Sequence, residues 1–223
     1  MKIHYERVGQ GKHTLFLMPG ALGYGYSRPP KRNFSGNFYF NDAIIASKLM
    51  KGVMSNWAVQ KLGCYKYSVL GWSDGGITGL ILAALDPQAV QHLVIWGASA
   101  YIAPSDAISM TAIKDVSQWS AKMRAPFEAI YGEDFSSLWH DYVEAISHNF
   151  KEEDNRICTE VLADIRCPTL ILHGDKDPLV DSEHPAYLHK HIKNSTPVKL
   201  VQGQCIGIIL CRPRQQSLQS KMI

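Results

Sequence analysis

Residues 67–85, YSVLGWSDGGITGLILAAL, place a short apolar run, a glycine-containing turn and a second apolar run in direct succession. The first run, 67–70, has the length and composition of a buried β-strand. The second run, 77–84, has apolar residues at helical spacing. A strand that leads through a tight turn into a helix is the building unit of α/β proteins, so this stretch predicts that class.

Further apolar runs repeat the pattern along the chain. They cover 14–18, 93–96, 169–173 and 198–201, and the first three are each followed by glycine or proline. Strands that are apolar almost throughout are typical of parallel sheets buried on both faces. We therefore predict an α/β-fold with a mostly parallel sheet and helices on both faces.

The spacing changes between residues 101 and 166, where helical periodicity continues without a strand-like run. This segment is predicted to be a helical cap inserted into an α/β-core of residues 1–100 and 167–201. Residues 202–223 are predicted to form an atypical C-terminal tail, because they lack the apolar spacing of a closing helix.

Length and composition favour one folded domain. The chain has 223 residues, of which 46% are hydrophobic and 19% charged, with a formal net charge of +3. These values are close to the globular average, and the basic residues are scattered, which argues against a nucleic-acid or membrane surface. No segment resembles a signal peptide or a transmembrane span, so we expect a cytoplasmic or mitochondrial monomer that acts on a small molecule.

The cysteines give no sign of a metal or disulfide framework. They are widely spaced and odd in number, without a C-x-x-C pair, and comprise Cys64, Cys158, Cys167, Cys205 and Cys211. This pattern predicts reduced thiols and no zinc site. We expect no cofactor.

The motif Gly71-Trp72-Ser73-Asp74-Gly75 matches G-x-S-x-G between the predicted strand and helix. In that context the serine lies on a strained turn that exposes its Oγ, so Ser73 is the candidate nucleophile. The backbone N–H of Asp74, at the helix N-terminus, is a candidate oxyanion donor. The alternative is an ordinary turn in which Ser73 caps the helix.

Two further segments complete the candidate site. The turn after strand 14–18 offers a second backbone oxyanion donor at Leu22 or Ala21. Strand 169–173 is followed by two carboxylates, and we prefer Asp177 over Asp175 as the catalytic acid because Pro178 fixes the chain just after it.

At this point the sequence resembles the α/β-hydrolases, and within them the valacyclovir hydrolase-like serine hydrolases of amino-acid esters. The matching segments are 70–78 (LGWSDGGIT), 94–98 (VIWGA), 115–120 (DVSQWS) and 173–180 (HGDKDPLV). The resemblance extends over most of residues 60–200.

The resemblance implies that Ser73 is the nucleophile, Asp177 the acid, and Leu22 and Asp74 the oxyanion donors. It also implies that the Asp74 carboxylate pairs with the α-ammonium group of the substrate. A carboxylate beside the nucleophile repels anionic substrates and attracts a cationic amino group, which supports this role. The alternative for Asp74 is a first-turn carboxylate that complements the helix dipole.

The chain also departs from the family pattern. A helix and a core strand normally separate the oxyanion turn from the following loop, but here residues 19–23 run directly into 24–30. We therefore predict that one core strand is missing, as is the closing helix. Unpaired backbone groups inside a sheet cost about 1–3 kcal/mol each, so this loss would weaken the sheet. Residues 52–60 look like an insertion.

The predicted general base is absent. The family histidine follows the last strand in a G-x-H context, which here reads Gly203-Gln204-Cys205. A thiol with a pKa of about 8.5 is mostly protonated at neutral pH and is a poor base. The other histidines near the predicted acid are weaker substitutes, namely His173, His184, His189 and His191.

Three functional hypotheses follow. The first is a serine hydrolase of α-amino-acid esters, impaired by the missing histidine. The second is a non-catalytic splice variant or misassembled gene model. The third keeps the fold but changes the substrate, to another carboxylic ester or to a carbon–carbon bond.

Overall fold

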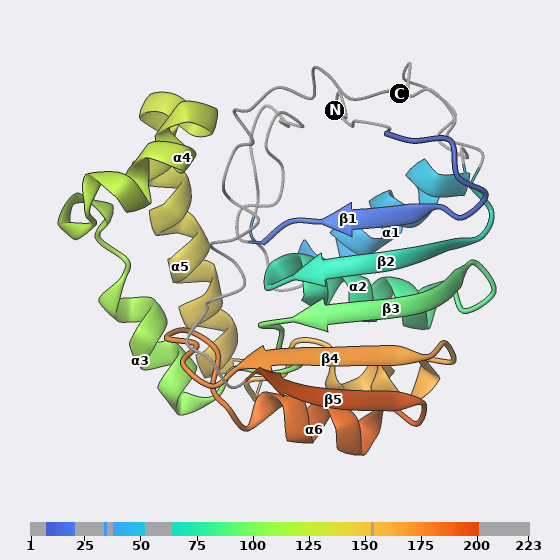
Figure 1. Cartoon of the computed structure of the whole chain (residues 1–223). Helices are drawn as coiled ribbons and strands as arrows, with labels where there is room; N and C mark the ends of the chain where they lie inside the picture. The colour runs from blue at the N-terminus through green and yellow to red at the C-terminus, as the bar shows by residue number, and fades with distance from the viewer. Residues whose placement is uncertain (1–7, 21–33, 35–37, 52–63, 153, 201–223) are drawn as a thin grey trace.

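The structure is a computed structural model, and it describes residues 8–20, 34, 38–51, 64–152 and 154–200. Five parallel strands form one sheet in the order β1-β2-β3-β4-β5 (Figure 1). They are β1 (Leu15–Met18), β2 (Tyr67–Trp72), β3 (Val90–Trp96), β4 (Thr169–Gly174) and β5 (Ser195–Leu200). The prediction of a parallel α/β-sheet is confirmed.

Strand limits differ most from the sequence prediction at β3 and β5. Both strands begin three residues earlier than their apolar runs, because β3 starts at Val90 and β5 at Ser195. The β5 extension contains Pro197, which lacks an N–H donor and is tolerated in an edge strand of this sheet.

Helices lie in two groups. Along the sheet are α1 (Phe38–Lys51), α2 (Asp74–Leu85), the short 3-10 helix η3 (Thr159–Asp164) and α6 (His184–His191). At the C-terminal ends of the strands are α3 (Pro104–Ala112), η1 (Val116–Gln118), α4 (Ala121–Tyr131), η2 (Gly132–Asp134) and α5 (Phe135–Glu152) (Figure 1). Within the described residues, no helix is both long enough and apolar enough to cross a lipid bilayer.

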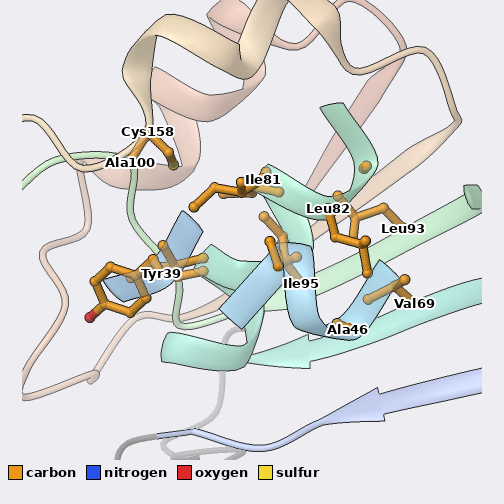
Figure 2. Close-up of a cluster of buried hydrophobic side chains, with 14 of the residues drawn as sticks. Tyr39, Ala46, Val69, Ile81, Leu82, Leu93, Ile95, Ala100 and Cys158 are labelled. Atoms are coloured by element: carbon orange, nitrogen blue, oxygen red, sulfur yellow. The ribbon is translucent and has the colours of Figure 1, made fainter. Parts of the chain in front are cut away.

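The core is centred on α2, which is apolar on all sides. Leu80, Ile81 and Leu82 are each fully buried, as expected for a helix covered on every face. Figure 2 shows Leu82 beside the strand residues Val69 and Leu93. Each buried side chain of this size stabilises the fold by about 1.5–3 kcal/mol, so α2 is held firmly against the sheet.

The opposite face of the sheet is less covered by the described residues. Leu15 and Leu17 are 51% and 63% exposed, and Val198 on β5 is 38% exposed. The strand register places these side chains on the same face as Leu70, away from Val69.

The predicted loss of a core strand leaves no gap in the described sheet. Strand β1 pairs with β2 over Leu15–Met18 and forms one edge of the five strands. The missing strand was expected to leave unpaired backbone groups inside the sheet, and none of the five described strands is separated from its neighbour in this way.

Candidate active site

Ser73 lies on a strained turn between β2 and α2. Its backbone has φ 52° and ψ −120°, a conformation that costs a residue other than glycine about 1–3 kcal/mol. Three backbone hydrogen bonds hold the turn: the Ser73 N–H donates to the Trp96 carbonyl, and the Ser73 carbonyl accepts from Gly76 and Ile77. Ser73 occupies the N-cap position of α2, but its side chain makes no capping hydrogen bond, so the structure gives no support for a capping role of the Ser73 hydroxyl.

The glycines around Ser73 are required by close packing. A Cβ atom added to Gly71 would lie 2.7 Å from the Gly76 Cα, and one added to Gly76 would lie 2.7 Å from the Ala98 Cβ. Real Cβ atoms do not approach other carbons this closely, so larger residues would push α2 away from β2 and β3. The motif therefore fixes how tightly the helix follows the strand.

Asp177 lies in the loop after β4, at the same edge of the sheet as Ser73. Its Oδ1 accepts hydrogen bonds from the backbone N–H groups of Leu179 (3.0 Å) and Val180 (3.1 Å). Its Oδ2 lies 3.2 Å from where a Cβ on Gly97 would be, just after β3. The carboxylate is thus held over the end of the neighbouring strand, whereas Asp175 is exposed to solvent.

Asp74, the first residue of α2, has two tyrosine partners. Its Oδ1 accepts hydrogen bonds from the hydroxyls of Tyr39 on α1 (3.1 Å) and Tyr142 on α5 (2.8 Å). Both rings are almost fully buried. Sequence reasoning missed these tyrosines, because aromatic residues at helical spacing do not show where their hydroxyls point.

Ser73 and Asp74 open into one cavity of about 70 Å³. The helical segment after β3 supplies much of its wall through Met110, Trp139, Tyr142 and Ile146, and Leu179 and Val180 close another side. The wall is mostly apolar, with the carboxylates of Asp74 and Asp106 as its charged groups. Such a cavity suits a small, largely apolar group that carries one polar end.

Asp106 is a second buried carboxylate that sequence reasoning missed. Its Oδ2 contacts the His184 Nε2 at 2.7 Å and accepts a hydrogen bond from the Ala103 N–H at 2.8 Å. Its Oδ1 accepts from the Asp181 N–H at 2.8 Å. These contacts join the start of α3 to the segment that follows Asp177.

None of the described histidines lines the cavity. His184 contacts Asp106, His189 contacts the Ser195 hydroxyl, and His191 contacts the Tyr187 carbonyl. His173 is 2% exposed, and its Nε2 has no hydrogen-bond partner among the described residues. Burial lowers the pKa of His173, and the nearby charge of Asp177 opposes this change.

Two predicted site residues lie outside the described part of the chain. These are the oxyanion donor Leu22 and Cys205, the position where the family histidine is expected. The alternative donor Ala21 also lies outside it. Among the described residues, no group of three or more His, Cys, Asp or Glu could hold a metal ion.

The fold and the strand–turn–helix motif define the class of this protein. Residues 13–129 match the family described as alpha/beta hydrolase fold. The chain therefore belongs to this family of hydrolases, and the predicted resemblance to α/β-hydrolases is confirmed.

Two curated relatives of this chain are serine hydrolases. The chain is 40% identical to serine hydrolase BPHL of Mus musculus, over 91% of this chain and 76% of the mouse protein. It is 39% identical to serine hydrolase BPHL of Homo sapiens, over 92% of this chain and 77% of the human protein. A lipase-esterase related protein from Clostridium acetobutylicum has the same fold, with a TM-score of 0.60, 17% identity and coverage of 94% and 96%.

Proposed function

We propose that this chain is a serine hydrolase built to act on small esters of α-amino acids. The observation that carries the proposal is the adjacency of Ser73 and Asp74 at the start of α2, with both residues lining one mostly apolar cavity. An ester with a free amino group would place its carbonyl near Ser73 while its ammonium group pairs with the Asp74 carboxylate. Charge-assisted pairing of this kind is about twice as strong as a neutral hydrogen bond.

In the proposed reaction the Ser73 Oγ attacks the ester carbonyl carbon. The Oγ proton passes to a base and then to the departing alkoxide, which leaves as an alcohol, while the acyl group stays bound to the Ser73 Oγ. In the second half of the reaction water attacks this acyl-serine, its proton passes through the base to the Ser73 Oγ, and the amino acid is released. Backbone N–H groups of Asp74 and Leu22 would stabilise the negative oxygen in both steps.

We propose that Asp177 is the acid that orients the base. In the family this base is a histidine at the position that here is Cys205. Loss of one member of a catalytic triad removes most of the rate but leaves a residual effect of roughly 10³–10⁴-fold over water, from the oxyanion donors and binding. We therefore propose that turnover by this chain is slow.

We also propose that residues 101–166 act as a cap. Two observations support this for the helices between residues 104 and 152: they lie beside the C-terminal ends of the strands (Figure 1), and they supply much of the cavity wall. The last helix of the segment, η3, packs instead along the sheet against α2. Substrate size would then be limited by residues such as Trp139 and Met110.

A second candidate is a non-catalytic protein that binds an amine in the same cavity. It is favoured by Cys205 and by the lack of a histidine in the described cavity wall. A splice variant or misassembled gene model would give this outcome.

The test compares two esters that differ only in the amino group, valine methyl ester and 3-methylbutanoic acid methyl ester. We expect a higher kcat/KM for the valine ester, loss of turnover of both esters in Ser73→Ala, and loss of the preference alone in Asp74→Asn. Equal kcat/KM values for the two esters would reject the amino-acid specificity and favour a general carboxylesterase. Identical rates for the wild type and Ser73→Ala would favour the non-catalytic candidate.

A further inference from the structure

The carboxylate of Asp74 is held from two sides. Tyr39 is 35 residues before it in sequence and Tyr142 is 68 residues after it, yet both hydroxyls donate to the same oxygen, Oδ1. The donors come from different layers, because α1 packs against α2 whereas α5 belongs to the helical segment at the strand ends (Figure 1). The Asp74 carboxylate therefore links α1, in the core, to α5 at the strand ends by hydrogen bonds.

Both tyrosine rings are fixed by aromatic packing. Tyr39 is 2% exposed and its ring centroid lies 4.0 Å from that of Phe38. Tyr142 is 4% exposed and packs against Phe34 at 5.6 Å and Trp139 at 5.5 Å. Figure 2 shows Tyr39 at the margin of the drawn apolar side chains, with its hydroxyl directed away from them. Rings held in this way keep their hydroxyl oxygens within hydrogen-bond distance of the Asp74 Oδ1.

The Tyr39 hydroxyl remains a donor over the physiological pH range. Burial raises the pKa of Tyr39 well above its usual value, and the neighbouring Asp74 charge raises it further. A protonated hydroxyl that donates to a carboxylate favours the ionised form of that carboxylate. The arrangement thus stabilises a negative charge inside a mostly apolar cavity.

We propose that Tyr39 and Tyr142 are positioning residues that orient the ionised Asp74 carboxylate for an α-ammonium group. The inference rests on the proposed function, and it adds the source of the specificity: the carboxylate is fixed before the substrate arrives. Because its orientation is fixed in the free protein, little ordering remains to be done when the ligand binds. Because Tyr142 is part of α5, the specificity also depends on the position of α5 relative to Asp74.

The experiment measures binding, so it does not depend on turnover. The probes are valinamide and 3-methylbutanamide, which differ only in the amino group. The readout is the ratio of their dissociation constants, measured by calorimetry on the full chain. If a tyrosine had only a structural role, its replacement would weaken the binding of both amides equally and leave this ratio unchanged.

We expect wild type to prefer valinamide, and Tyr39→Phe and Tyr142→Phe each to lower the ratio about tenfold, since a hydrogen bond to a charged group is lost. Tyr67→Phe is the matched control. Tyr67 is also a buried tyrosine, but its hydroxyl has no hydrogen-bond partner among the described residues. It begins β2, at the opposite end of the strand from Ser73.

The outcomes separate the two proposals. A wild-type preference that is lost in Asp74→Asn but retained in both tyrosine variants would overturn the positioning role alone. A wild type that binds the two amides equally would overturn the proposed amino-acid specificity, and the positioning role with it. A ratio that falls equally in the Tyr67→Phe control would show that the effect is not specific to the two tyrosines.

Discussion

The contact between Gly76 and Ala98 offers a quantitative test of the packing at the nucleophile turn. A Cβ on Gly76 would lie 2.7 Å from the Ala98 Cβ, whereas ordinary van der Waals contact between such atoms begins at 3.4 Å. Overpacking of this kind costs about 1–3 kcal/mol. Replacing glycine by alanine inside a helix gains about 1 kcal/mol. Gly76→Ala should therefore lower the free energy of unfolding by about 0–2 kcal/mol, the difference between these two terms.

Ala98→Gly removes the group that the new methyl would meet. In the double variant Gly76→Ala/Ala98→Gly, the added methyl would occupy the space that the Ala98 methyl leaves. We expect the double variant to be more stable than the sum of the single effects by about 1–3 kcal/mol, the overpacking cost that is relieved.

Urea unfolding of wild type, both single variants and the double variant measures this coupling energy. Effects that add within about 0.5 kcal/mol would mean that Gly76 and Ala98 do not constrain each other, and would rule out tight packing between them. A further check is the m value, which should stay constant if only native packing is changed.

Three other predictions concern the residues around the site. Ser73→Gly should be about 1 kcal/mol more stable than Ser73→Ala in thermal unfolding, because glycine adopts φ 52° without strain; equal stabilities would contradict strain at this position. Asp106→Ala should lower the free energy of unfolding by about 3 kcal/mol, since it leaves two buried hydrogen-bonding groups and one part-buried group without their partner. The exposed Asp175→Ala control should change it by less than about 0.5 kcal/mol. Folding lowers the pKa of His173, so the unfolded chain binds more protons than the folded chain as the pH drops below about 6.5, and the free energy of unfolding should fall there. His173→Gln should reduce this pH dependence in urea unfolding measured from pH 7 to pH 5. An unchanged dependence would show that His173 is not its source.

The sheet could be predicted well from the sequence because its strands are apolar almost throughout. Residues 67–70 and 169–173 were recognisable as buried parallel strands, and they lie in β2 and β4. The strained turn at Ser73 also follows from the sequence, since glycines flank the serine where strand and helix must approach closely. The first residues of β3 escaped prediction because Gln91 and His92 are exposed and polar, so the apolar pattern starts only after them.

The surroundings of the site could not be predicted in the same way. Tyr39, Asp74 and Tyr142 are brought together by the packing of three separate helices, and no local pattern encodes their contact. The same is true of Asp106 and His184, which are 78 residues apart. Helical periodicity identifies which face of a helix is buried, but it does not tell which buried hydroxyl or carboxylate will meet a partner.

The most direct test of a Ser73-dependent hydrolase is a set of initial rates on valine methyl ester for four chains: wild type, Ser73→Ala, Cys205→His and Cys205→His/Ser73→Ala. We expect slow turnover by wild type and a gain of roughly 10²–10⁴-fold in Cys205→His, the usual contribution of a general base. The gain should disappear when Ser73 is replaced in the Cys205→His chain. A Cys205→His chain that keeps its faster rate without Ser73, or that gains nothing, would exclude a Ser73 nucleophile served by a base at position 205.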